Sequence, residues 1–419
     1  MSPSSRARVR VASAATRLVN AASRAAGRGA GTVAGGRVGL GIARDLLERL
    51  TEGRAVALVS GTNGKTTTTK LLATALETQA QGAVVTNATG SNMPAGHVAA
   101  LVGAAPQRSA VLEVDEGYLP GVLRSTHPVA VVLLNLSRDQ LDRTNEVRML
   151  ANRWREALVD SGTAVVANAD DPLVAWGAGS ARRVVWVAAG TRWLADAVGC
   201  PSCGERIRFD QGPVETGWAC RCGFARPRPD VVVEGTGTDV VARFTDGRRL
   251  PVALSLPGRF NQSNAVMAAA AAEAMGVPAE IALAAMVGID GVAGRFSVRR
   301  LAGVSTRLML AKNPAGWAEL LDLIDVDTTP LVIGINAQVA DGRDPSWLWD
   351  VAFERLAGRP VIASGERCLD LSVRLHYAGV AHQVVPDQLG ALRRAAGEID
   401  GRVDFAGNYT AFFELAGRP

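Results

Sequence analysis

The chain is poor in lysine, in aromatic residues and in long apolar runs. Of its 45 Lys and Arg residues only Lys65, Lys70 and Lys312 are lysines, so each stands out against arginine. Aromatic residues make up 5% of the chain, and no basic–aromatic stripe surrounds the cysteines. This composition argues against nucleic-acid binding by a zinc-ribbon ATPase. No apolar run approaches the roughly 18 residues that span a bilayer.

The N-terminus lacks acidic residues. Eight arginines and no Asp or Glu precede Asp45, and apolar residues alternate with arginine. This pattern lacks the continuous apolar core of a signal peptide, which predicts a cytoplasmic location. Residues 1–50 are predicted to form an Arg-rich helical segment. It is either a solvated helix or a surface attracted to phosphate or to anionic lipid at the inner face of the membrane.

The length and patterning predict an α/β protein with more than one domain. A chain of 419 residues is too long for one ordinary core. Buried-strand patterns alternate with helical stretches over 51–297, which predicts a doubly wound parallel sheet. A Cys-rich segment interrupts this pattern at about 196–230. The strand–helix pattern then restarts, and 298–419 is predicted to form a smaller α/β domain.

A Gly-rich loop lies between a predicted strand and a predicted helix in "VALVSGTNGKTTTTK". Its glycines let backbone N–H groups surround phosphates at a helix N-terminus. The lysine is expected to reach the β- and γ-phosphates, and the threonine after it to offer its hydroxyl to Mg²⁺. Two residues separate the glycines instead of the usual four, so a purely structural loop is the alternative. The predicted nucleotide-binding residues are Gly61, Thr62, Asn63, Gly64, Lys65, Thr66 and Thr67.

The "GTNGKTT" segment resembles the signature of the Mur ligase superfamily. The resemblance implies that ATP phosphorylates a carboxylate and that an amine then attacks the acyl phosphate to form an amide, with ATP and Mg²⁺ required. Glu113, in "VLEVDEGYL", matches the Mg²⁺-binding glutamate of that family. Asp115 and Glu116 compete for this role, and a solvated loop acid is the other interpretation of Glu113.

Three further positions follow from the same resemblance. Gln140, in "NLSRDQLDR", stands where amino-acid-adding ligases have a metal-binding histidine, so a second metal site is in doubt. Asn261 and Asn264, in "LPGRFNQSNAVMAAA", match nucleotide contacts, although Asn264 could also cap the Ala-rich helix. Arg295 matches an arginine near the phosphates. "RDQLDR" is characteristic of one branch of the superfamily, MurT.

Four of the five cysteines form a CxxC and a CxC pair, and each pair is followed by glycine. A reducing compartment favours a metal over disulfides. Four thiolates leave no open position, so a structural Zn²⁺ is predicted, with an Fe–S centre as the less suitable alternative. A cysteine-rich insertion in a Mur-ligase core is a further resemblance to the MurT branch. Cys368 is predicted to be a buried helix residue and not a nucleophile. The predicted ligands are Cys200, Cys203, Cys220 and Cys222.

The C-terminal domain departs from amino-acid-adding Mur ligases at "LAKNPAG", where those enzymes have a segment like "DYAHNP". The Asn-Pro turn is retained while the acid and the histidine are lost. Lys312 is predicted to contact an anionic group such as a phosphate or a carboxylate. A solvated loop lysine is the alternative.

The segment "INAQVADGRDPSWLWD" resembles a MurT loop that reaches an amidotransferase partner and orients its catalytic histidine. Asp344 precedes Pro345 and Ser346, which is also a helix N-cap pattern. Asp341, before Gly342, is expected to be less constrained. The sequence leaves open which aspartate contacts the partner.

The resemblance to the MurT branch extends over nearly the whole chain. It implies ATP-dependent amidation of the α-carboxylate of D-glutamate in the lipid II stem peptide, giving D-isoglutamine through an acyl phosphate. The chain shows no convincing Cys-His glutaminase, so ammonia is expected from a GatD-type glutamine amidotransferase in a heterodimer. The alternative is an ATP-dependent amino-acid ligase of the Mur and folylpolyglutamate synthase superfamily.

Overall fold

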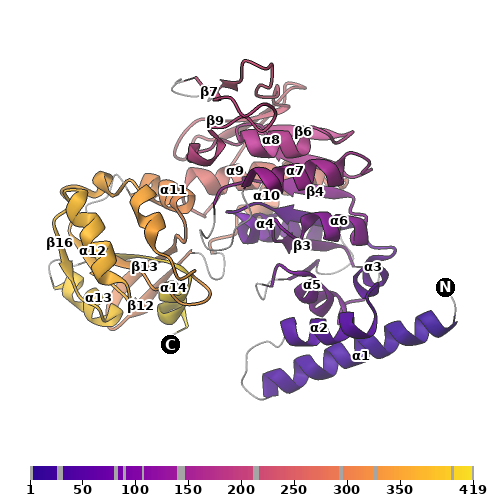
Figure 1. Cartoon of the computed structure of the whole chain (residues 1–419), viewed down its shortest axis with the longest axis horizontal. Coiled ribbons are helices and arrows are strands. Elements are labelled where there is room, and N and C mark those ends of the chain that lie inside the picture. Colours follow the sequence, from indigo (N-terminus) through magenta and orange to yellow (C-terminus); the bar gives the residue numbers. More distant parts are fainter. Residues whose placement is uncertain are drawn as a thin grey trace. The chain divides into compact units, whose positions relative to one another are not determined.

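The computed structural model, shown in Figure 1, describes most of the chain. Its described residues are 3–25, 32–79, 84–87, 91–105, 108–138, 147–210, 217–291, 296–324, 329–397 and 401–417. The chain divides into two compact units. Unit 1 comprises Met1–Leu136, Val147–Leu254 and Phe260–Gly288, and unit 2 comprises Ser137–Glu146, Ser255–Arg259 and Ile289–Pro419.

Unit 1 contains a mixed sheet with the strand order β11-β10-β9-β6-β5-β4-β1-β3-β2. Neighbours from β2 to β9 are parallel, whereas β10 and β11 extend the edge as antiparallel strands. The strands are β1 (Val56–Ser60), β2 (Val85–Thr86), β3 (Ala110–Val114), β4 (Ala130–Leu133), β5 (Ala164–Asn168), β6 (Val184–Ala188), β9 (Val231–Glu234), β10 (Val241–Phe244) and β11 (Arg249–Pro251).

The central strands of unit 1 are buried along their whole length, which accounts for their apolar sequences. Every residue of β1, β3, β4 and β5 is buried, because crossover helices cover both faces of such a sheet and favour continuous apolar runs. The helices are α1 (Pro3–Ala25), α2 (Thr32–Ile42), α3 (Leu46–Thr51), α4 (Lys65–Glu77), α5 (Pro94–Leu101), α6 (Leu119–Thr126), α7 (Val147–Leu158), α8 (Pro172–Ala178), α9 (Arg259–Ala274) and α10 (Ala279–Met286).

Unit 2 has a sheet of its own with the order β12-β13-β17-β14-β15-β16. Only the β12–β13 hairpin is antiparallel among its pairs of described strands. The strands are β12 (Phe296–Leu301), β13 (Val304–Leu310), β14 (Leu331–Gly334), β15 (Val361–Ser364), β16 (His382–Val384) and β17 (Arg402–Gly407). The helices are α11 (Pro314–Ile324), α12 (Cys368–Tyr377), α13 (Gln388–Ala396) and α14 (Tyr409–Ala416), with 3₁₀ turns η2 (Ser346–Asp350) and η3 (Phe353–Leu356).

These elements confirm the predicted α/β architecture. Helices α1 and α2 and most of α3 lie in the Arg-rich N-terminal segment, and Cys368 is a buried helix residue as predicted. One prediction is wrong: α9 already begins at Arg259, so Asn264 lies inside the helix and cannot be its N-cap. Within the described part of the chain, no helix is both long and apolar enough to cross a membrane.

Candidate active site

The Gly-rich loop follows β1, which lies between β3 and β4 in the sheet. Ligands of open α/β sheets bind at such a switch point, at the carboxyl ends of the strands. Gly61 and Gly64 have φ angles of 140° and 87°, a region that favours glycine. A Cβ on Gly64 would lie 2.9 Å from Asn264 Oδ1. The glycine therefore lets the loop approach α9 closely.

Asn135, two residues after the end of the neighbouring strand β4, holds the loop. Its carbonyl oxygen accepts a hydrogen bond from Thr62 N at 3.0 Å. Its side chain accepts from Asn63 N at 2.8 Å and donates to Asn63 O at 3.0 Å. This role was missed in the sequence, although Asn135 begins the "NLSRDQLDR" motif. The contact joins residues 72 positions apart, and local pattern does not reveal it.

Lys65 is the first residue of α4 and is 5% exposed. Its Nζ donates to Gly61 O at 2.5 Å and to Thr62 O at 3.2 Å, so the lysine folds back over its own loop. Nζ also donates to Glu116 Oε1 at 2.9 Å. Glu116 is thus the acidic partner of Lys65 and not the carboxylate nearest the threonine hydroxyl.

Glu113 lies at the carboxyl end of β3 and is 6% exposed, so it is not a solvated loop acid. Thr66 Oγ1 donates to Glu113 Oε2 at 2.8 Å. A hydroxyl oxygen and a carboxylate oxygen at this spacing are ligands that suit Mg²⁺. The geometry distinguishes Glu113 from its competitors Asp115 and Glu116.

Buried polar side chains fix the backbone of Glu113. Asn87 accepts from Glu113 N and donates to Glu113 O, at 2.8 and 2.9 Å. His97 Nε2 donates to the same carbonyl at 2.8 Å. Burial lowers the pKa of His97 to about 4, so the ring is neutral at physiological pH.

The other predicted nucleotide contacts divide into two groups. Thr67 is buried on α4, and Asn261 and Asn264 are buried on α9. Gln140 and Arg295 lie outside the described residues.

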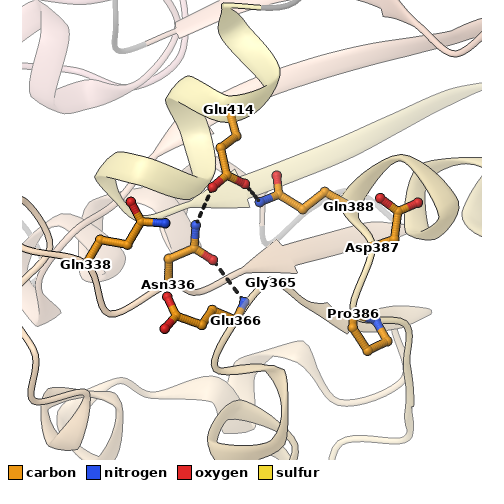
Figure 2. Close-up of a pocket in the computed structure, with 8 residues that line it drawn as sticks. All are labelled: Asn336, Gln338, Gly365, Glu366, Pro386, Asp387, Gln388 and Glu414. Atoms are coloured by element: carbon orange, nitrogen blue, oxygen red, sulfur yellow. Dashed lines mark hydrogen bonds between the residues drawn. The ribbon is translucent and has the colours of Figure 1, made fainter.

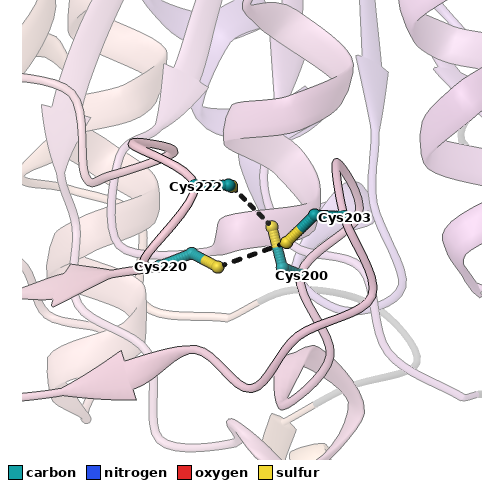
Figure 3. A group of neighbouring side chains, drawn as sticks. All are labelled: Cys200, Cys203, Cys220 and Cys222. Atoms are coloured by element: carbon teal, nitrogen blue, oxygen red, sulfur yellow. Dashed lines mark hydrogen bonds between the residues drawn. The ribbon is translucent and has the colours of Figure 1, made fainter.

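The four predicted zinc ligands come together, as Figure 3 shows. Cys200 Sγ lies 3.7 Å from Cys222 Sγ, and Cys203 Sγ lies 3.5 Å from Cys220 Sγ. All four sulfurs lie within 4.8 Å of one another. Zn–S bonds of about 2.3 Å in a tetrahedron place sulfurs about 3.8 Å apart. The group therefore fits a four-coordinate metal with no open position.

The backbone turns that follow the two cysteine pairs are consistent with this metal geometry. Gly204 and Gly223, one residue after each cysteine pair, have φ angles of 82° and 92°. Burial raises the pKa of the Cys200 thiol, whereas an N–H hydrogen bond from Phe224 lowers the pKa of the Cys222 thiol to about 7. The thiols thus shift in opposite directions, and it is their geometry that supports a metal.

The cysteine segment is anchored to the end of β5. Arg226 Nε donates to Asp170 Oδ1 at 2.6 Å, and Trp218 Nε1 donates to Ala169 O at 3.1 Å. The Trp218 and Phe224 rings pack with centroids 4.9 Å apart. The small hairpin β7 (Arg208–Phe209) and β8 (Trp218–Ala219) is too short to have a core of its own. Its buried side chains instead join a small cluster that contains Cys200, Ile207, Trp218, Cys220 and Ala175 of α8.

In unit 2 the two aspartates of the "ADGRD" loop differ in burial and in hydrogen bonding, and the difference is the reverse of the prediction. Asp341 is 6% exposed and accepts hydrogen bonds from Thr410 N, at 2.9 Å, and from the Thr410 hydroxyl. The prediction that Asp341 is the less constrained residue is wrong, because it holds the N-terminus of α14. Asp344 is exposed and accepts from Ser346 N at 2.9 Å, a local turn contact before η2.

Lys312 lies two residues after the end of β13 and is half-buried. Asn313 is fully buried, and its Oδ1 accepts from Gly316 N at 2.8 Å. This bond caps α11, with Pro314 as its first residue. The Asn-Pro turn thus fixes the backbone that carries Lys312.

A polar cavity of 320 Å³ lies at the carboxyl ends of β14, β15 and β16 (Figure 2). Asn336 Nδ2 and Gln388 Nε2 both donate to Glu414, at 3.1 and 2.8 Å. Asn336 Oδ1 accepts from Glu366 N at 2.9 Å. The wall of this cavity is consequently a hydrogen-bonded network in which carboxamides hold a carboxylate.

Two family models match the chain on either side of the cysteine segment. The Mur ligase middle domain matches residues 59–194, and the MurT ligase C-terminal domain matches residues 310–412. The chain is 28% identical over 391 residues to "Lipid II isoglutaminyl synthase (glutamine-hydrolyzing) subunit MurT" of Staphylococcus aureus, covering 89% of this chain and 88% of that protein. In sequence, the chain is MurT-like along nearly its full length. The Streptococcus pneumoniae protein of the same description is 28% identical, with 84% and 83% coverage.

Solved structures agree with this MurT-like assignment at the level of the fold. A pseudomurein peptide ligase type C from Methanothermus fervidus superposes with a TM-score of 0.67 and 18% identity, covering 87% of this chain and 78% of that one. MurF from Acinetobacter baumannii superposes with a TM-score of 0.65 and 16% identity, covering 91% and 79%. These structures show the fold alone, and it is the similarity to the MurT proteins that identifies the chain as an ATP-dependent ligase.

Proposed function

We propose that this chain is the synthetase subunit that amidates the α-carboxylate of D-glutamate in the lipid II stem peptide. The observation that carries the proposal is the grouping of Lys65, Thr66 and Glu113 at the end of β1, in a chain similar to MurT proteins along nearly its full length. The first half of this observation supports phosphoryl transfer from ATP. The second supports the identity of the carboxylate.

The residues have distinct roles in this proposal. Bound ATP with Mg²⁺ supplies the phosphoryl group that activates the carboxylate as an acyl phosphate. The loop N–H groups and Lys65 would hold the phosphates, while Thr66 and Glu113 would hold the metal. Ammonia then displaces phosphate from the activated carbonyl and forms D-isoglutamine. Asn261 and Asn264 of α9 would contact the nucleotide beside Gly64.

Lys312 is proposed to bind an anionic group of the reactants. A lysine suits a phosphate or carboxylate as a compact positive charge, and the capped turn at Asn313 restricts where its backbone can lie. If Lys312→Ala amidated at the normal rate with unchanged ATP dependence, this role would be excluded.

The ammonia is proposed to come from a separate GatD-type glutamine amidotransferase. Four cysteines form the proposed metal-binding group, and Cys368 is buried at the start of α12. None of the five is therefore proposed as the nucleophile of a glutaminase. Asp344 is the aspartate proposed to reach the partner, because it is exposed and Asp341 is not. Nearby, the exposed rings of Trp349 and Tyr377 lie 5.6 Å apart and offer an aromatic contact surface.

The cysteine group is proposed to hold a structural Zn²⁺, and the enzyme is proposed to act at the cytoplasmic face of the membrane. The closed four-thiolate geometry supports the first point. A lipid-linked substrate supports the second.

A single assay tests the proposed function. Purified chain is incubated with lipid II, ATP and ammonium, and the product is analysed by mass spectrometry together with released phosphate. Amide formation with ammonium alone is expected, and glutamine should replace ammonium only when the partner is added. Incorporation of an amino acid would instead indicate a Mur- or folylpolyglutamate-type ligase. ATP hydrolysis that responds only to DNA or RNA would refute both.

A further inference from the structure

The first helix, α1, has one face packed into unit 1. Ala12, Thr16 and Asn20 follow one another at four-residue spacing and are buried. They meet α2 at Gly35 and Gly39, where an added Cβ would lie within 2.2 Å of the Asn20 and Thr16 side chains. Contacts then connect α2 to α5, and α1 lies on the outside of this pair (Figure 1).

The opposite face of α1 is apolar and exposed. Val11 and Leu18 are 59% and 72% exposed, although burying either side chain would be favourable. Positions seven apart lie within about 20° of each other on a helix. The exposed residues therefore form one stripe along the helix, which we call the outer stripe: Ala7, Val11, Ala14, Leu18, Ala21 and Ala25.

Arginines flank the outer stripe. Arg10, Arg17 and Arg24 repeat at the same seven-residue spacing and are all exposed, as are Arg6 and Arg8. No acidic residue occurs before Asp45. Of the acids that follow in and around α3, Asp45 and Glu52 are paired with Arg49. Among the described residues, no ion pair joins these arginines to an acid, so the outer face of α1 combines apolar side chains with positive charge.

We propose that α1 lies in the plane of an anionic bilayer surface, with its outer stripe at the acyl boundary and its arginines at the lipid phosphates. An apolar stripe bordered by arginines is how a helix binds at such an interface. A second copy of the chain fits less well, because pairing two outer stripes would bring flanking arginines of like charge together. The inference rests on the proposed function, since a lipid-linked substrate places the enzyme at this surface.

Vesicle co-sedimentation of the full chain tests the inference. The chain should bind vesicles containing phosphatidylglycerol, should bind phosphatidylcholine vesicles much more weakly, and should be released by added salt. Each arginine near the surface contributes about a factor of five, so R10Q/R17Q/R24Q should weaken binding roughly 100-fold. V11S/L18S should also weaken binding while leaving the charge unchanged. A matched control, R182Q/R300Q/R393Q, removes three exposed arginines from other elements and should bind nearly as wild type.

Three outcomes would overturn the inference. The first is equal binding to neutral and anionic vesicles, and the second is full binding by R10Q/R17Q/R24Q. The third is a dimer in sedimentation velocity that V11S/L18S converts to a monomer, which would assign the stripe to a second copy. Circular dichroism and the melting temperature establish that the variants are folded. Amidation is assayed separately in detergent, so loss of vesicle binding with retained amidation refutes only the membrane surface, and the reverse refutes only the proposed function.

Discussion

Lys65 Nζ lies 2.9 Å from Glu116 Oε1, and the two side chains are 5% and 12% exposed. The Glu116 carboxylate thus forms an ion pair with the lysine that is proposed to bind phosphate. In the proposed nucleotide complex, Lys65 would exchange this carboxylate for a phosphate.

Glu116→Gln should lower the stability of the protein without nucleotide more than its stability with nucleotide bound. Loss of a charged hydrogen-bond partner for a buried lysine should cost about 1–2 kcal/mol of unfolding free energy without nucleotide. The nucleotide-bound form should lose much less, so affinity for a non-hydrolysable ATP analogue should rise by up to about tenfold. Calorimetry and melting curves measure both effects. Weaker analogue binding by Glu116→Gln would show that Glu116 assists the phosphates instead.

Glu113→Gln should remove Mg²⁺-dependent activity with little change in fold. The amide oxygen can still accept the bond from Thr66, but it has lost the charge that a divalent ion prefers. Loss of one such electrostatic contact typically lowers kcat by about 100-fold or more. Asp115→Asn is the matched control, because Asp115 accepts from Gly117 N and not from the loop. Equal effects of the two substitutions on the Mg²⁺ dependence would contradict the assignment.

Substitutions of the two loop aspartates should have different effects, one on stability and the other on glutamine-dependent activity. Asp341→Asn removes charge from a buried group that accepts two bonds from Thr410, and should lower the unfolding free energy by about 1–3 kcal/mol. Asp344→Asn should change stability by less than about 0.5 kcal/mol, yet abolish glutamine-dependent amidation while ammonium still supports it. If Asp344→Asn retained glutamine-dependent activity with the partner present, Asp344 would not be the contacting residue.

His97 should make the protein more stable as the pH rises from about 4 to 6.5. Burial lowers its pKa from 6.5 to about 4 in the folded chain, so in this window the unfolded chain binds the extra proton. The contribution is about 3 kcal/mol across the window, at 1.36 kcal/mol per pKa unit. Urea unfolding at several pH values measures the slope. His97→Gln should flatten it, and an unchanged slope would assign the dependence to other groups.

Metal removal should unfold the cysteine segment before the sheet. A strong chelator or Cys220→Ser should reduce zinc content from about one per chain to near zero. Trp218 packs against Phe224 in this segment, so its fluorescence should change at a lower temperature than the far-ultraviolet circular dichroism. Cys368→Ser should keep its zinc, because that residue lies on α12. One zinc per chain in Cys220→Ser would place the metal elsewhere.

Local patterns were sufficient for the elements and for residues that act within one short segment. Buried strands such as β1 and β3 have uninterrupted apolar sequences, and a glycine at a positive φ angle precedes Lys65. The cysteine pairs likewise carry their own turn glycines. In each case the residues that determine the geometry are neighbours in sequence.

The tertiary structure decided what depends on distant contacts. Asn135 holds Asn63 across 72 positions, and Asp341 is buried because Thr410, 69 positions later, supplies its partners. A sequence pattern records spacing along one element, whereas burial and pairing depend on which elements the fold brings together. The sequence by itself thus determined an α/β ligase with a Gly-rich loop after its first strand and two cysteine pairs. Only the fold showed that Glu116 holds Lys65, that Glu113 faces Thr66 and that Asp344 is the aspartate left exposed.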